Sequence, residues 1–222
     1  MNPPFSEISS HLITLLASLM LVLQILLAVQ PMLITSVRLF ALQSLLLAAI
    51  AGVVGYTYNA WHVLIIAALT VLGKVIFLPW RLERLVRQIK IVQEIQPFLN
   101  TPASMLICGA LTVLAYVVAR PITSLERLGS NTLAVAIALL LTGFFLMINR
   151  RKALTQVLAL LTMENGVMLA AIALTTYGMP LVVEIGIFFD VVVAVMVLGI
   201  LVFRIRETFA SMDVSKLNEL KW

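Results

Sequence analysis

Long runs of apolar residues, each about long enough to cross a bilayer, are the feature that most restricts the fold of this chain. A helix needs about 20 apolar residues to cross the hydrocarbon of a membrane. The sequence contains seven such runs, at residues 9–30, 37–57, 60–80, 103–120, 131–149, 153–176 and 180–203. Only 11% of the residues are charged, whereas an ordinary globular domain has about 25%. We therefore predict an all-α membrane protein with seven transmembrane helices.

The positions of proline and the absence of alternating patterns support this assignment. Pro31, Pro121 and Pro180 lie at the edges of predicted spans, where a helix can stop without leaving a backbone group unpaired in lipid. The alternation of apolar and polar residues that a membrane barrel needs does not occur. No Lys or Arg precedes the first run and no small-residue cleavage site follows it, so we expect a retained span and not a secretory signal.

Basic residues fall mostly on one side of this seven-span arrangement. Arg120 and Arg127 lie on the other side, and Lys74 lies inside the third run. Cytoplasmic loops of membrane proteins are rich in Lys and Arg, so we expect the N-terminus outside and the C-terminus in the cytoplasm. The net charge of +5 then reflects topology and not nucleic-acid binding. The residues on the predicted cytoplasmic side are Arg38, Arg81, Arg84, Arg87, Lys90, Arg150, Arg151, Lys152, Arg204, Arg206, Lys216 and Lys221.

Two segments outside the runs carry charged and apolar residues at helical spacing. Residues 80–100 could extend the third helix into the cytoplasm or lie along the membrane interface. Residues 205–222 have the pattern of a short amphipathic tail. Both segments could equally be simple solvated ends of their helices.

A weak internal repeat indicates how the helices are grouped. LLLAAIA at 45–51 is similar to VMLAAIA at 167–173, and VLG occurs at both 71–73 and 197–199. Parallel repeats are known among membrane proteins, although spans rich in Leu, Ala and Val also match by chance. Within a single transmembrane domain, 1–222, we predict three parts: a three-helix unit with a cytoplasmic extension at 1–102, a linking helix at 103–130, and a second three-helix unit with a cytoplasmic tail at 131–222.

Four ionisable side chains stand out within the apolar runs, where an ionisable group costs at least about 2.5–3.5 kcal/mol to insert. They are Lys74, Glu164, Glu184 and Asp190. Counted along their helices from the nearest basic residues, Glu164 and Asp190 lie near the bilayer midplane. Glu184 lies closer to the outer interface. Lys74 is either deeply buried or extends its amine toward the cytoplasmic headgroups.

Two interpretations of these groups are open. In the first, they are neutral or paired and serve helix packing. In the second, which we favour, they form a proton or cation path, because burial disfavours their charged forms and brings them toward the range in which protons exchange. Gln43 and Asn165 could bridge them, directly or through water, as could Gln24 and the Thr and Ser residues of the spans, although such side chains more often hold helices together.

Other chemistry is not indicated by the sequence. His11 and His62 lie at span boundaries and Cys108 is the single cysteine, so we expect no metal site and no disulfide framework. The sequence has no glycine-rich phosphate loop, no CxxC motif and no nucleophile elbow. We therefore expect that this chain carries no catalytic residues and binds no cofactor.

The run TGFFLMINRRKALTQVLALLTMENGVMLAAIA at 142–173 resembles the first two helices of the small K-type (4L-type) membrane subunit of complex I. That family pairs a span, a basic cytoplasmic turn and a second span with a membrane glutamate, which corresponds here to Glu164. Its third helix carries another acid. Asp190 takes that place in VEIGIFFDVVVAVMVLGILVFRI, as an aspartate where that family has a glutamate.

The whole chain is similar to the E component of hydrogenase-4-type (group 4) membrane-bound [NiFe] hydrogenases, a seven-span relative of that subunit. The most specific match is the combination of MENG with LVVEIGIFFDVVVAVMVLG. LGKVIFLP, ALQSL and the tail MDVSKLNELK also look like that family. These segments lie at 163–166, 181–199, 72–79, 41–45 and 212–221.

The resemblance implies a role inside a complex in the cell (inner) membrane of a bacterium or archaeon. Such subunits lie between antiporter-like membrane subunits and the core membrane subunit that meets the hydrogenase large and small subunits, and they contribute buried carboxyls to a chain of proton sites. The [NiFe] centre and the iron–sulfur clusters belong to partner subunits. In formate hydrogenlyase versions, a formate dehydrogenase is attached as well.

Three alternatives to this role remain. A C-type subunit of a multisubunit sodium/proton antiporter shares the three-helix core but is typically shorter than this chain. A purely structural membrane spacer would hold its acids in fixed pairs. A small autonomous exporter would need a central substrate cavity and would function when expressed alone, and we rank it last.

Overall fold

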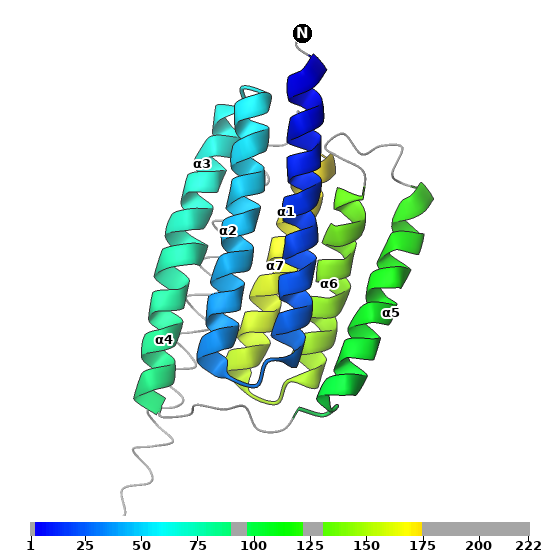
Figure 1. Cartoon of the computed structure of the whole chain (residues 1–222). Coiled ribbons are helices and arrows are strands. Elements are labelled where there is room, and N and C mark those ends of the chain that lie inside the picture. Colours follow the sequence, from blue (N-terminus) through cyan, green and yellow to red (C-terminus); the bar gives the residue numbers. More distant parts are fainter. Residues whose placement is uncertain (1–2, 90–96, 122–130, 175–222) are drawn as a thin grey trace, which may run out of the picture.

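The computed structural model describes residues 3–89, 97–121 and 131–174, and these residues fold into a bundle of long helices (Figure 1). No strand occurs within these three stretches. Helices α1, α2, α6 and α7 pack together, while α5 and the column formed by α3 and α4 lie at opposite edges of the bundle (Figure 1). The elements are α1 (Pro3–Val29), α2 (Leu33–Thr57), α3 (Trp61–Thr70), the π-helical segment η1 (Val71–Phe77), α4 (Leu78–Ile89), α5 (Thr101–Ala119), α6 (Thr132–Asn149) and α7 (Ala153–Leu174).

The all-helical prediction is confirmed for these residues, and the first six predicted spans are present. Six helical stretches are long and apolar enough to cross a membrane: Ile8–Val29, Leu33–Thr57, Val63–Arg84, Thr101–Ala119, Thr132–Asn149 and Leu154–Leu174. The seventh predicted span, 180–203, and the tail at 205–222 lie outside the described residues, so the count of seven is matched only in part. The division into two three-helix units stays a prediction.

The third span continues without interruption through α3, η1 and α4 as far as Ile89. The first half of the segment 80–100 therefore extends this helix, which is one of the two alternatives that the charge pattern left open. Its packing explains why it stays helical. Leu82 and Val86 of α4 are buried, whereas Arg81, Arg84 and Arg87 are exposed, so apolar and basic residues occupy different faces.

The turn between α2 and α3 is closed by an asparagine in the left-handed conformation. Asn59 has φ 51°, which asparagine tolerates better than most residues. The amide of Ala60 donates to the carbonyl of Gly55 at 2.9 Å, and the amide of Asn59 donates to Tyr56 at 3.4 Å. This pair of bonds is the Schellman arrangement that ends many helices, and it reverses the chain within a few residues.

Helices α6 and α7 approach each other closely because glycine lies at their contacts. A Cβ atom on Gly166 of α7 would lie 3.0 Å from the carbonyl oxygen of Ala136 and 3.0 Å from Cβ of Leu139. On α6, a Cβ atom on Gly143 would lie 3.2 Å from the backbone nitrogen of Met163. Small residues allow membrane helices to pack backbone against backbone. This contact determines the position of the residues between Met163 and Gly166, which include two candidate site residues.

At the end of the bundle where α1 meets α2, a buried arginine satisfies the last carbonyls of α1. Arg150 is 4% exposed, and its Nη2 donates to the carbonyls of Leu27 at 2.9 Å, Ala28 at 2.9 Å and Gln30 at 3.1 Å. These carbonyls have no partner within their own helix. Arg150 therefore does more than mark the cytoplasmic side, which is the only role that the charge pattern gave it.

Candidate functional site

A layer of buried polar side chains crosses the bundle between two apolar clusters. One cluster includes Met20 and Leu47, and the other includes Leu27 and Phe40. Because the polar residues lie between these positions along α1 and α2, they occupy the middle of the bundle. We call this set the polar layer; its members are Gln24, Gln43, Ser44, Lys74, Thr162, Glu164 and Asn165.

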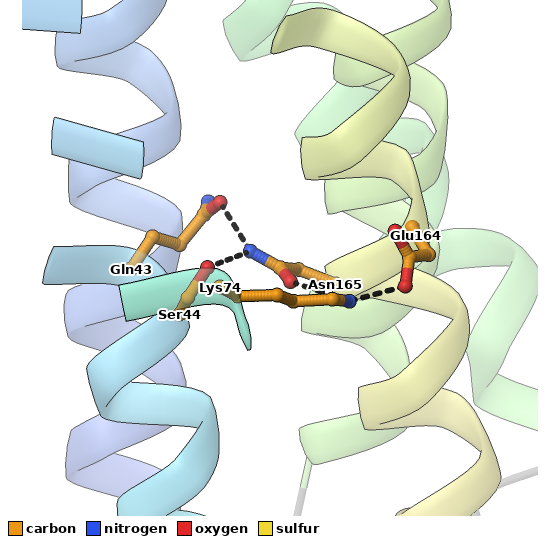
Figure 2. Close-up of polar contacts among 5 residues, drawn as sticks. All are labelled: Gln43, Ser44, Lys74, Glu164 and Asn165. Carbon is orange, nitrogen blue, oxygen red and sulfur yellow. Dashed lines mark hydrogen bonds and ion pairs between the residues drawn. The ribbon is translucent and has the colours of Figure 1, made fainter. Parts of the chain in front are cut away.

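The two charged members of the polar layer form an ion pair. Nζ of Lys74, on η1, contacts Oε1 of Glu164, on α7 (Figure 2). The side chain of Lys74 is 2% exposed and that of Glu164 is 12% exposed. The amine therefore points into the bundle, and of the two sequence alternatives for Lys74 the structure shows deep burial. Burying either charge alone in a membrane is unfavourable in free energy, and the ion pair lowers this unfavourable free energy for both side chains.

Asn165 lies at the centre of the polar layer and contacts three of its members. Its Oδ1 accepts a hydrogen bond from Lys74 Nζ at 3.4 Å. Its Nδ2 donates to Gln43 Oε1 at 3.2 Å and to Ser44 Oγ at 3.0 Å (Figure 2). The side chain thus joins η1, α7 and α2. Since Glu164 and Asn165 are consecutive in sequence, α7 presents the carboxylate and the amide to opposite sides of the same lysine amine.

The hydrogen bonds continue from Gln43 to α1 and return to α7. Nε2 of Gln43 donates to Gln24 Oε1 at 2.9 Å and to the carbonyl of Met20 at 3.3 Å. Nε2 of Gln24 donates to Thr162 Oγ1 at 3.4 Å, and this hydroxyl donates to the carbonyl of Ala159 at 2.8 Å. Thr162 is one helical turn before Asn165, so the backbone of α7 connects the two ends of this series and closes a ring through α7, α2 and α1.

Most of this ring cannot exchange protons by titration. Amide and hydroxyl side chains donate and accept hydrogen bonds but hold no proton that ionises near neutral pH. Lys74 and Glu164 are the titratable members of the polar layer. The amide ring therefore orients the lysine, while the ion pair contains the titratable side chains of the layer.

The backbone around Lys74 is distorted, and Pro79 explains the distortion. Proline has no amide hydrogen, and its ring clashes with the carbonyl one turn earlier, so a regular helix cannot pass through it unchanged. Over Val71–Phe77 the chain winds more widely, and the amide of Leu78 bonds to the carbonyl of Gly73, five residues back. Such π-helical turns occur frequently at functional sites. Here the distortion places Lys74 in the polar layer.

The structure brings together four of the six residues that the sequence singled out. Lys74, Glu164, Gln43 and Asn165 form one connected group, whereas Glu184 and Asp190 lie outside the described residues. Gln24, Ser44 and Thr162 also belong to this group; the sequence indicated Gln24 as a further bridging amide, and Ser44 and Thr162 only among the Ser and Thr residues of the spans. Ser44 follows Gln43, and Thr162 lies three residues before Asn165, so comparison of depth along α2 and α7 would have indicated both.

The C-terminal part of the chain matches a known family. Residues 131–222 match the family of NADH-ubiquinone/plastoquinone oxidoreductase chain 4L. Glu164, Asn165 and Thr162 lie in this part, while Gln24, Gln43, Ser44 and Lys74 precede it. The polar layer is therefore built from both parts, and the lysine that pairs with Glu164 comes from outside the matched region. No solved structure matches the chain.

Similarity to full-length proteins covers most of the chain. It is 36% identical over 187 residues to the uncharacterized protein Rv0085 of Mycobacterium tuberculosis, which covers 83% of this chain and 84% of that protein. It is 34% identical over 186 residues to hydrogenase-4 component E of Escherichia coli K12 and of Shigella flexneri, which covers 82% of this chain and 84% of each relative. The similarity thus extends well beyond residues 131–222.

Proposed function

This chain belongs to the hydrogenase-4 component E family, and we propose that it provides a proton-carrying site in the membrane part of a complex I-like, group 4 hydrogenase. In this proposal it also bridges antiporter-like subunits to the core membrane subunit. The [NiFe] centre and the iron–sulfur clusters are held by the hydrogenase large and small subunits. A formate dehydrogenase is attached if the complex oxidises formate.

The Lys74–Glu164 ion pair is the observation that carries this proposal. While Glu164 is ionised, the two charges attract each other in a medium of low dielectric constant. When Glu164 takes up a proton, this attraction is lost and the amine keeps its hydrogen bond to Asn165 at 3.4 Å. A negative charge arriving near Lys74 therefore favours proton uptake by Glu164, and its departure favours release. The charge state of one residue thereby controls the proton on the other.

The arrangement also indicates where protons reach the ion pair. Lys74 is enclosed, whereas the Glu164 side chain is partly exposed at the edge of the described bundle. Beyond Lys74 lie the amides of Asn165, Gln43 and Gln24, which do not titrate. Protons therefore enter and leave by way of Glu164. Asp190 and Glu184, together with acids or lysines of neighbouring subunits, continue the path in this proposal.

Glu164→Gln tests the proposal, because glutamine keeps the shape and the hydrogen-bonding capacity but cannot ionise. We expect the complex to assemble, while proton translocation coupled to hydrogen turnover falls to the background of vesicles without protein. Subunit composition by mass spectrometry and pH changes in proteoliposomes provide the two measurements. Asp190→Asn should act in the same direction and more mildly. Glu83→Gln, which changes a carboxylate of α4 outside the polar layer, is the matched control and should pump normally.

Wild-type pumping rate and ratio in a complex that carries both Glu164→Gln and Asp190→Asn would contradict the proton path. The two acids would then serve packing, as in a structural spacer. If the complex with Glu164→Gln does not assemble, Glu164→Asp is used as a second variant, because aspartate keeps an ionisable group. Recovery of pumping with aspartate, and not with glutamine, would assign the effect to the proton.

We also propose that the N-terminus lies outside and the C-terminus in the cytoplasm. Arg38, the basic residues of α4 and Arg150–Lys152 lie at one end of the bundle, and Arg120 lies at the other. A green fluorescent protein fused after Trp222 should fluoresce, whereas alkaline phosphatase at the same position should be inactive. Active phosphatase with dark fluorescent protein would reverse the orientation.

A further inference from the structure

Three arginines and a tryptophan form a compact group at the end of α4. Arg81, Arg84 and Arg87 are exposed and lie within two turns of helix, and Trp80 is 57% exposed beside them. We call this set the α4 basic cluster. It takes no part in the polar layer, and a role in topology alone does not explain its geometry.

An open hollow of about 420 Å³ lies on the cluster. Trp80, Glu83, Arg84 and Arg87 line it. The guanidinium of Arg84 lies over the Trp80 ring, 5.9 Å from its centre, which holds the arginine at the rim through cation–π attraction. The indole and the guanidinium groups of Arg84 and Arg87 therefore all border the hollow.

Glu83, the carboxylate among the residues that line the hollow, already forms ion pairs with two arginines. Glu83 Oε1 bonds to Nε of Arg38 at 3.1 Å, and its Oε2 lies 3.7 Å from Nη2 of Arg87. Among the residues that the structure describes, no carboxylate lies within ion-pair distance of Arg81 or Arg84. The three arginines of the cluster lie beside one glutamate, which also pairs with Arg38 of α2, so the cluster keeps a net positive charge and favours an anion.

The depth of the cluster indicates which anion. The membrane-spanning stretch of this helix, Val63–Arg84, ends inside the cluster. Trp at that position is typical of the membrane–water interface, where headgroups lie. One to two turns earlier, toward the hydrocarbon, the exposed residues are Leu72, Ile76 and Phe77, which offer an apolar surface to an acyl chain. A soluble acidic ligand has no acyl chain that could contact this apolar surface.

We propose that the α4 basic cluster binds an anionic phospholipid, with its phosphodiester group in the hollow between Arg84 and Arg87 and an acyl chain along Leu72, Ile76 and Phe77. Guanidinium groups suit this ligand because their fork of donors matches two phosphate oxygens. The bound lipid would fasten the end of α4 at the interface. This site is independent of the proton path, so either proposal can fail alone.

The fluorescence of Trp80 reports directly on lipid in the hollow. The full chain carrying Trp61→Phe and Trp222→Phe keeps Trp80 as its single tryptophan. It is reconstituted in phosphatidylcholine bilayers that contain brominated phosphatidylglycerol or, in parallel, the same fraction of brominated phosphatidylcholine. Bromine quenches tryptophan at contact. We expect preferential quenching by the anionic lipid, and Arg84→Gln and Arg87→Gln should each lower this preference by up to about five-fold.

Arg120→Gln is the matched control, since it removes an exposed positive charge from the opposite end of the bundle, and it should leave the preference unchanged. Inorganic phosphate added to the bilayers should not relieve the quenching, because it lacks the acyl chain. Equal quenching of Trp80 by the two brominated lipids would overturn the proposal. So would an anionic preference that both arginine variants retain, or one that free phosphate removes.

Discussion

Lys74→Met is expected to lower the free energy of unfolding by about 3–5 kcal/mol, because it leaves Glu164 as a charge without its lysine partner in the middle of the bundle. Methionine fills a similar volume, so little of the loss should come from packing. The measurement is unfolding of the full chain in mixed micelles by titration with sodium dodecyl sulfate.

The double variant Lys74→Met/Glu164→Gln separates the ion pair from the rest of the polar layer. It removes both charges, and we expect it to recover most of the stability that Lys74→Met alone loses. Gln43→Leu is the control within the same layer, because it removes three hydrogen bonds without exposing a charge. If the single lysine variant were as stable as the wild-type chain, the pairing of Lys74 with Glu164 would not be a stabilising contact.

Arg150→Met is the second substitution with a large expected effect, a loss of about 3 kcal/mol. The guanidinium serves the carbonyls of Leu27, Ala28 and Gln30, and a buried acceptor left without a donor costs about 1–3 kcal/mol. The same micelle titration measures this loss. Limited proteolysis should also show faster cleavage in the link between α1 and α2, since the cap holds the end of α1.

The neighbouring arginine provides the control for Arg150. Arg151 is exposed and lies over the Phe98 ring, 4.3 Å from its centre, so Arg151→Met should cost no more than about 1 kcal/mol. The loss in free energy of unfolding for Arg150→Lys should lie between those for Arg150→Met and Arg151→Met, because an ammonium group can donate to some of the same carbonyls. Equal losses for Arg150→Met and Arg151→Met would show that the helix cap contributes nothing beyond charge.

The predicted helices up to Leu174 agree with the structure because a membrane leaves few alternatives. Backbone groups in hydrocarbon must bond within their own helix, so apolar runs of sufficient length become spans. The differences lie at the ends. The helix that begins at Trp61 continues as far as Ile89, because α4 buries Leu82 and Val86 while it exposes its arginines. Charge pairs alone could not separate this outcome from a helix lying on the interface.

By itself, the sequence determined that this is a helical membrane protein and that Lys74, Glu164, Gln43 and Asn165 needed an explanation, since hydropathy and insertion cost are properties of single residues and short windows. The tertiary structure alone decided which of them meet. Lys74 and Glu164 are 90 residues apart in sequence, and their contact depends on the close packing of α6 against α7 and on the wide turn before Pro79. The tertiary structure also assigned Arg150 to the end of α1, because the carbonyls that it satisfies belong to a helix more than 100 residues earlier. Contacts of this kind follow from how helices rotate and approach one another, and a linear pattern of charges and apolar residues does not contain that information.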